Sequence, residues 1–273
     1  PLMNTFRDNQ DYEADMFVNN HEAKEIMDDN TLLVVVDTNK PSITQCEDLL
    51  YMAKMIVVLD HHRQGSDTIR NSVLSYIEPY ASSASEMVAE ILQYFTEGIR
   101  IRNVEADSIY AGIMIDTDNF MQKTGVRTFE AAAFLRRCGA DVTRVRKLFR
   151  EDMNDYKARG ETIRNAELFR GQFAISECPS DYVDSPTVVG AQAANELLNI
   201  VGVKASFVLT EYKGVIYISA RAIDEVNVQI IMERMGGGGH LNMAGCQLET
   251  VNMEGARNLL KSTLTEMQDG GEI

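Results

Sequence analysis

Three apolar runs in the first 120 residues each end in an aspartate. They are residues 31–37 (TLLVVVD), 54–60 (KMIVVLD) and 109–116 (IYAGIMID). Runs of this length and β-branched content are typical of strands that are buried on both faces of a parallel sheet. Helix-like stretches over residues 42–53 and 83–97 lie between them. The alternation predicts an α/β domain built from βαβ units.

The second half of the chain has its own alternation of strand-like and helix-like segments. Residues 205–211 and 215–221 flank a Lys213-Gly214 turn signal and predict a β-hairpin. Asn227 is a favourable N-cap for a short helix that follows the hairpin. The remaining predicted segments are a strand over 172–178 and helices over 187–200, 228–235 and 254–267.

A polar helical stretch separates these two halves. Residues 128–138 read as a helix closed by Gly139, and residues 141–170 read as further helix with a charged face. We therefore expect two α/β lobes with an active site in the cleft between them. The predicted boundaries are a parallel-sheet catalytic domain over 1–145, a helical linker over 146–170 and a smaller substrate-binding domain over 171–273.

The charge balance narrows the class of ligand. The 273 residues carry a formal net charge of −15, whereas proteins that bind duplex nucleic acid usually present a basic face. A small anionic ligand held at a local site fits this charge better than a long polymer. The four cysteines have no CxxC spacing, so neither a zinc site nor a disulfide framework is indicated. No apolar run approaches the roughly 20 residues of a membrane helix.

The first chemical cluster stands at the strand ends: Asp37, the Asp60-His61-His62 triplet, and Asp116. In open α/β sheets, ligands bind beyond the carboxyl ends of the strands. Carboxylates together with imidazoles suit Mn²⁺, iron or Zn²⁺, and two such ions can clamp a phosphoryl group. Each residue taken alone has a simpler interpretation, because an aspartate after a strand is often a turn residue. Their recurrence at three predicted strand ends favours the metal site.

The second cluster is the run Gly236 to Gly239, followed by His240. Glycines let the backbone approach a ligand closely and point N–H groups at it, so the run is suited to phosphate. Arg221, at the end of a predicted strand, would add a bidentate phosphate contact. The alternative interpretation is a flexible loop or the tail of a helix.

Four motifs in order resemble the DHH–DHHA1 phosphoesterase family. VVVDT over 34–38, LDHHRQ over 59–64 and GIMIDTDNF over 112–120 are similar to motifs of the DHH domain. The segment 218–245, with its GGGGH, is similar to the DHHA1 domain. Finer stretches, 76–92 and 125–149, resemble the GdpP-type cyclic di-AMP phosphodiesterases more closely than the NrnA-type nano-RNases or the RecJ exonucleases.

The resemblance implies a role for each matched position. Asp37 would bridge two Mn²⁺ ions, and His61 and Asp116 would be further metal ligands. Asp60 would support the metal ligands without binding a metal itself, and His62 would contact the scissile phosphate. In the second domain, the residues implied to hold the other phosphate and the ribose are Arg221, Asn227, Gly237, Gly238, Gly239 and His240.

One family motif is absent from the sequence. The first metal-binding motif, roughly His-x-x-x-Asp-x-Asp, cannot be found, and His21 is interpreted as a surface helix residue. We expect the chain to be part of a longer protein in which that motif, and the first strand of the fold, precede Pro1. The metal site of the isolated chain would then be incomplete.

The predicted function is Mn²⁺-dependent hydrolysis of cyclic di-AMP to 5′-pApA. Two alternatives stay open: an NrnA-type oligoribonuclease and pAp phosphatase, or a nucleotide-binding module without turnover. The predicted partner is a cyclic dinucleotide or short oligoribonucleotide, with no duplex nucleic acid, and a homodimer is an open possibility. By the resemblance, the chain would be a cytoplasmic domain of a parent that is anchored in the bacterial membrane through upstream segments.

Overall fold

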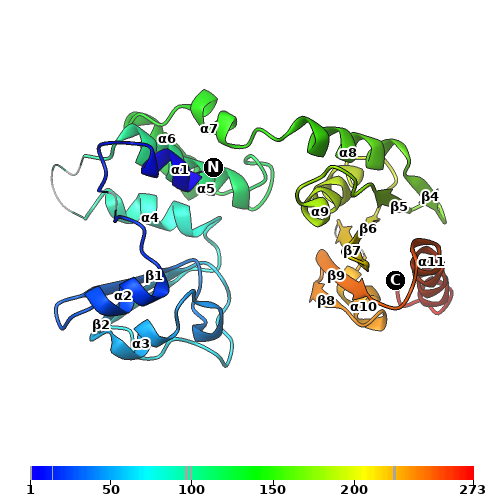
Figure 1. Cartoon of the computed structure of the whole chain (residues 1–273), viewed down its shortest axis with the longest axis horizontal. Coiled ribbons are helices and arrows are strands. Elements are labelled where there is room, and N and C mark those ends of the chain that lie inside the picture. The colour runs from blue at the N-terminus through cyan, green and yellow to red at the C-terminus, as the bar shows by residue number, and fades with distance from the viewer. Residues whose placement is uncertain (1, 14, 96–97, 99, 224–225) are drawn as a thin grey trace. The chain divides into compact units, whose positions relative to one another are not determined.

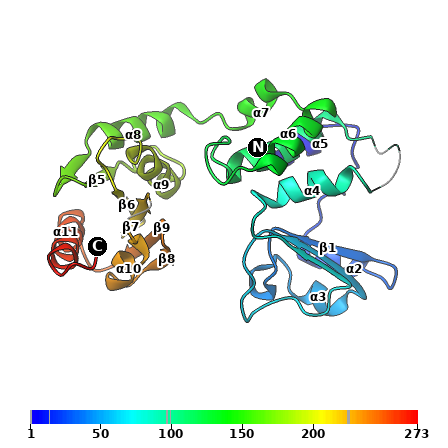
Figure 2. The same ribbon diagram turned by 180° about the vertical axis from the view of Figure 1, so that it is seen from behind.

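The computed structural model divides the chain into two compact units, Pro1–Arg150 and Glu151–Ile273 (Figures 1 and 2). Each unit packs helices against a sheet, which confirms the predicted α/β class. No helix in the described part of the chain is long and apolar enough to cross a membrane. The structure describes residues 2–13, 15–95, 98, 100–223 and 226–273.

The first unit contains a three-stranded parallel sheet. β1 (Leu32–Val36) and β2 (Met55–Asp60) confirm two predicted strands, and β3 (Leu74–Ile77) completes the order β1-β2-β3. β2 is central, and its Ile56 and Val58 side chains are buried. Because all three strands run in the same direction, their carboxyl ends meet at one edge of the sheet.

The third predicted strand, over residues 109–116, is wrong. This segment belongs to a helix, α5 (Asn103–Asp116), whose buried side chains include Ala106, Tyr110 and Ile113. These three positions have helical spacing. Apolar side chains are spread so widely around α5, however, that its sequence shows no single apolar face. A short apolar run does not distinguish a buried strand from a buried helix. The strand that does form, β3, is short and half polar, and gave no comparable signal.

Helices of the first unit form a separate core beside the sheet. α4 (Ala84–Leu92), α6 (Val126–Arg137) and α7 (Val142–Leu148) pack with α5 around side chains that include Ile113 and Leu135. The helix predicted over 83–97 is shorter than expected, and its residues 96–97 lie outside the described part of the chain. The shorter helical elements are α1 (Leu2–Arg7), α2 (Asn20–Ile26), η1 (Pro41–Ile43) and α3 (Asp48–Met52).

The helix predicted over 141–170 is instead two helices, α7 and α8 (Met153–Arg164), and its last part is wrong because residues 167–169 form a strand. The Asp152 side chain accepts a hydrogen bond from the backbone N–H of Asn154 and so starts α8 as a new helix. Ala158 of α8 is buried against Ala193 of α9 (Pro186–Leu197). The packing therefore places α8 within the second unit.

The second unit is a six-stranded sheet covered on both faces. α8 and α9 cover one face and α10 (Val228–Arg234) and α11 (Met253–Asp269) cover the other. The strand order is β4-β5-β6-β7-β9-β8. The strands are β4 (Glu167–Phe169), β5 (Phe173–Cys178), β6 (Ala205–Tyr212), β7 (Val215–Ala222), β8 (Gly238–His240) and β9 (Met243–Leu248).

The predicted hairpin is confirmed. β6 and β7 pair antiparallel around Lys213 and Gly214, which have φ angles of 52° and 78°. Two consecutive positive φ values fit the tight turn that the right-handed twist of a hairpin favours. The glycine run was expected as a loop, but its second half forms the edge strand β8 against β9.

Candidate functional site

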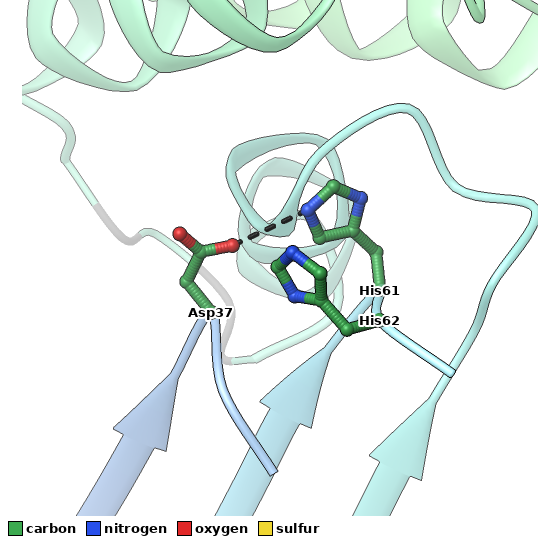
Figure 3. A group of neighbouring side chains, drawn as sticks. All are labelled: Asp37, His61 and His62. Carbon is green, nitrogen blue, oxygen red and sulfur yellow. Dashed lines mark ion pairs between the residues drawn. The ribbon is translucent and has the colours of Figure 1, made fainter. Parts of the chain in front are cut away.

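Asp37 and His61 meet where β1 and β2 end. The backbone N–H of Asp37 donates to the carbonyl of Leu59 at 2.9 Å, which extends the strand pairing by one residue. Asp37 then takes a left-handed conformation with φ 67°, which is uncommon for a residue other than glycine and is found often at functional sites. Its Oδ1 lies 3.3 Å from His61 Nε2. One ligand atom each from Asp37, His61 and His62 lies within 4.8 Å of the others (Figure 3).

The His61 ring is held in the orientation that a metal ligand needs. Its side chain is 11% exposed, and Nδ1 lies 3.4 Å from the carbonyl oxygen of Ala81. Because a carbonyl only accepts, we assign the proton to Nδ1. The lone pair of Nε2 then faces Asp37, and a backbone carbonyl behind the ring is a usual partner for a ligating histidine.

Asp116 reaches the same place from a helix instead of a strand. Its Oδ2 lies 3.9 Å from His61 Nε2. Burial raises the pKa of Asp116, His61 lowers it, and the nearby Asp37 carboxylate raises it. As the last residue of α5, Asp116 also stands at the negative end of the helix dipole. The ionised carboxylate is therefore unfavourable here unless a cation is present.

These donors fit a divalent cation. Two carboxylates and imidazole nitrogens converge, and oxygen with imidazole ligands suits Mn²⁺, iron and Zn²⁺. A bound cation would relieve the repulsion between Asp37 and Asp116. Both residues and the two histidines offer ligand atoms to it.

Asp60 is fully buried and is engaged by hydrogen bonds. Its Oδ1 lies 2.7 Å from His62 Nδ1 and accepts from the His62 backbone N–H at 3.1 Å. Its Oδ2 accepts from Asn39 Nδ2 at 2.5 Å. The Asp60 carboxylate therefore orients the His62 ring, whose own side chain is exposed at the site.

Asn39 was missed by the sequence analysis. It is 2% exposed, and its Nδ2 also approaches the backbone carbonyl of His62 at 3.3 Å. The backbone carbonyl of Asn39 accepts a hydrogen bond from the N–H of Ile69. Asn39 therefore holds both ends of the segment that follows β2. The available signal was its position two residues after Asp37. A polar residue in that turn is common for other reasons, so the signal was not specific.

In the second unit, three side chains from neighbouring strands share one face of the sheet. Met243 on β9 pairs directly with Arg221 on β7 and with His240 on β8. Directly opposed residues of antiparallel strands point to the same face. Asn227 does not belong to these strands; its Oδ1 accepts from the N–H of Gln229 and caps α10.

The glycines of the run differ in what the fold requires of them. A Cβ at Gly237 would lie 2.1 Å from the carbonyl oxygen of Gly245, and one at Gly239 would lie 2.5 Å from Ala244 Cα. Packing against β9 therefore excludes any larger side chain at both positions. A Cβ at Gly238 would meet nothing within 4 Å, and Gly238 has no positive φ.

The parallel sheet with an Asp-His-His triplet at the tip of its central strand, followed by a second α/β unit, defines a DHH-type protein of two domains. Residues 2–113 match the DHH family, N-terminal domain, and residues 172–266 match the DHHA1 domain. Together the matches take up well over half of the chain, which belongs to the DHH–DHHA1 family. Metal dependence is general for its phosphoesterases.

Two relatives match most of the chain at more than 40% identity. The chain is 43% identical over 259 residues to the cyclic-di-AMP phosphodiesterase GdpP of Bacillus subtilis, and 41% identical over 243 residues to the cyclic-di-AMP phosphodiesterase PdeA of Listeria monocytogenes. These matches take up 93% and 89% of this chain but only 39% and 37% of the relatives, so the chain spans about two fifths of their length.

Two further comparisons are more distant. The bifunctional oligoribonuclease and PAP phosphatase NrnA of Mycoplasma genitalium is 28% identical, over 78% of this chain and 68% of its own length. The crystal structure of an exopolyphosphatase-related protein from Bacteroides fragilis has a TM-score of 0.79 at 21% identity, over 91% of this chain and 75% of that one. That structure supports the fold.

We predict that His61→Ala weakens Mn²⁺ binding by more than about 10-fold, because it removes the nitrogen that faces both carboxylates. Calorimetric titration of Mn²⁺ into the protein would measure this. His21→Ala is the matched control, because His21 lies exposed on α2, where it pairs only with Glu25 in the described residues. Equal loss in both variants would contradict the assignment.

We predict opposite effects of Asp116→Asn on stability and on metal binding. The raised pKa of Asp116 means that its ionised form destabilises the metal-free fold above the carboxyl's ordinary pKa, and that protonation removes this penalty as pH falls. In EDTA at pH 7 the variant should melt higher, on the order of 1 °C after allowance for solvent screening. The stabilisation that added Mn²⁺ gives the wild type should be lost. A lower melting temperature in EDTA would contradict this account.

Proposed function

We propose that the chain is the catalytic part of a phosphodiesterase that hydrolyses cyclic di-AMP to 5′-pApA with Mn²⁺. The observation that carries the proposal is the convergence of Asp37, His61 and His62 within 4.8 Å at the tips of adjacent parallel strands. The 43% identity to GdpP over 93% of the chain supports the choice of substrate.

The proposed metal is Mn²⁺, as two ions, and Asp37, His61 and Asp116 are the residues that would hold them. Such ions, when bound, lower the pKa of water and neutralise charge on the phosphoryl group. His62 contacts the scissile phosphate, and Asp60 fixes its ring by the 2.7 Å hydrogen bond to Nδ1. A ring with its orientation fixed costs less entropy to align with the reacting phosphate.

The second unit would hold the rest of the substrate. We assign the second phosphate and its ribose to six residues there. Arg221 carries a guanidinium and His240 an imidazole on the same face, and Gly238 leaves open space beside them. A guanidinium forms paired hydrogen bonds to phosphate, and this fixes the substrate's orientation. The six residues are Arg221, Asn227, Gly237, Gly238, Gly239 and His240.

We also propose that the chain acts in the bacterial cytoplasm as a domain of a parent that is anchored in the membrane, with a homodimer as the open alternative to a monomer. The similarity to GdpP supports the first assignment. Fractionation of cells that express the parent, with light scattering of the purified chain, tests both.

We predict that the longer parent protein that contains this chain, supplied with Mn²⁺, converts cyclic di-AMP to 5′-pApA faster than it cleaves linear pApA or pAp, as followed by chromatography of the products. EDTA should abolish turnover, and so should His61→Ala. Faster cleavage of the linear substrates would favour the NrnA-type alternative. Tight binding of cyclic di-AMP without turnover, even in excess Mn²⁺, would favour a nucleotide-binding module.

We predict that two neighbouring glycines separate substrate binding from folding. Gly238→Ala should leave the melting temperature unchanged, because its Cβ meets no atom of the described residues, and should weaken cyclic di-AMP binding by about 10-fold or more. Gly237→Ala should destabilise the fold by about 1–3 kcal/mol, because its Cβ would overlap the Gly245 carbonyl oxygen. Unchanged binding by Gly238→Ala would remove the glycine run from the proposed site.

A further inference from the structure

Arg221 is a half-buried cation without a carboxylate partner among the residues that the structure describes. Its Nε donates to Asn195 Oδ1 at 2.8 Å, and its Nη1 donates to the carbonyl of Ala220 at 2.9 Å. Both acceptors are neutral. Burial lowers the pKa of the guanidinium, in line with the lack of a carboxylate partner among the described residues.

Other sheltered arginines of the chain are paired differently. Arg127 lies 2.6 Å from Glu90, Arg159 lies 2.5 Å from Glu151, and Arg257 lies 2.8 Å from Glu177. In each case a carboxylate neutralises the guanidinium at short range. Arg221 departs from this pattern in the unit whose sheet also carries the glycine run. A sheltered charge that the fold leaves unneutralised is costly unless an anion arrives to pair with it.

Asn195 determines which part of the guanidinium stays free. It lies in the last turn of α9, where the helix has no basic residue and its end carries partial negative charge. With Nε occupied by Asn195, the remaining N–H donors of Arg221 are on the two Nη atoms. Those atoms form the fork that can hold two phosphate oxygens at once.

We infer that Asn195 is a positioning residue that aims Arg221 at the substrate phosphate while leaving its full charge available. The inference rests on the proposed function and adds a specific requirement to it. The residue beside Arg221 must accept a hydrogen bond, and it must be neutral. An aspartate at this position would preserve the hydrogen bond and cancel the charge that the phosphate needs.

The test compares Asn195→Asp and Asn195→Ala by calorimetric binding of cyclic di-AMP in EDTA, where no metal supports turnover. Asn195→Ala should raise Kd by about 5- to 10-fold, the effect of one side-chain hydrogen bond of ordinary strength. Asn195→Asp should raise it further, although it keeps the acceptor. The control is Asn199→Asp, the same change one turn further on, where the side chain contacts Glu196 instead; its Kd should stay within about twofold of wild type.

A double-mutant cycle separates positioning from a general structural effect. In an Arg221→Ala background, Asn195→Asp should not raise Kd further, because the group through which it acts is gone. Melting curves by circular dichroism should match the wild type for both Asn195 variants. A wild-type Kd for Asn195→Asp, or the same increase in the Arg221→Ala background, would overturn the inference.

The binding test of the Asn195 inference and the turnover test of the proposed function can fail independently. Absence of wild-type binding in EDTA would overturn the inference, because it assigns Arg221 an anion site that needs no metal. The proposed hydrolysis is judged by the turnover assay with Mn²⁺, and its failure there with normal Asn195-dependent binding would leave the positioning role standing.

Discussion

Crowding of negative charge at one edge of the three-stranded sheet is the constraint on which the site depends. Three aspartates converge there, and the fold treats them unequally. Asp60 is fully buried, and hydrogen bonds from Asn39 and His62 stabilise its charge. Asp37 and Asp116 both approach Nε2 of His61, with no such donors among the described residues. The charge left over would favour a cation at this edge.

The two adjacent histidines, His61 and His62, differ in the group that lies behind each ring. His61 is backed by a neutral carbonyl at Ala81, and His62 is backed by the buried carboxylate of Asp60. The Asp60 carboxylate holds Nδ1 of the His62 ring and so fixes the orientation of that ring. The proposed roles match this difference: His62 would meet a phosphate, and His61 would be a metal ligand.

The sequence predicted the parts of this site that depend on strand geometry. Two apolar runs ending in aspartate were enough to place Asp37 beside His61, because parallel strands end at a common edge. Asp116 was predicted near them for the wrong reason, since its segment is helical. Asn39 was not predicted, because its importance comes from burial of the turn after β1, which no local pattern encodes. Of the glycine run, the sequence could not show that Gly237 is required by the packing of β9.

Helix α5 links two parts of the first unit, the helical cluster and the three-stranded sheet, each of which has a hydrophobic core of its own. Its flanks pack among α4, α6 and α7, whereas its final carboxylate reaches the tip of the sheet. An ion shared by Asp116 and His61 would therefore act as a cross-brace, tying the helical cluster to the strands through a single coordination sphere. A bound ion would then make local unfolding rarer in the less stable of these two parts, the helical cluster or the sheet, including at positions far from the metal site.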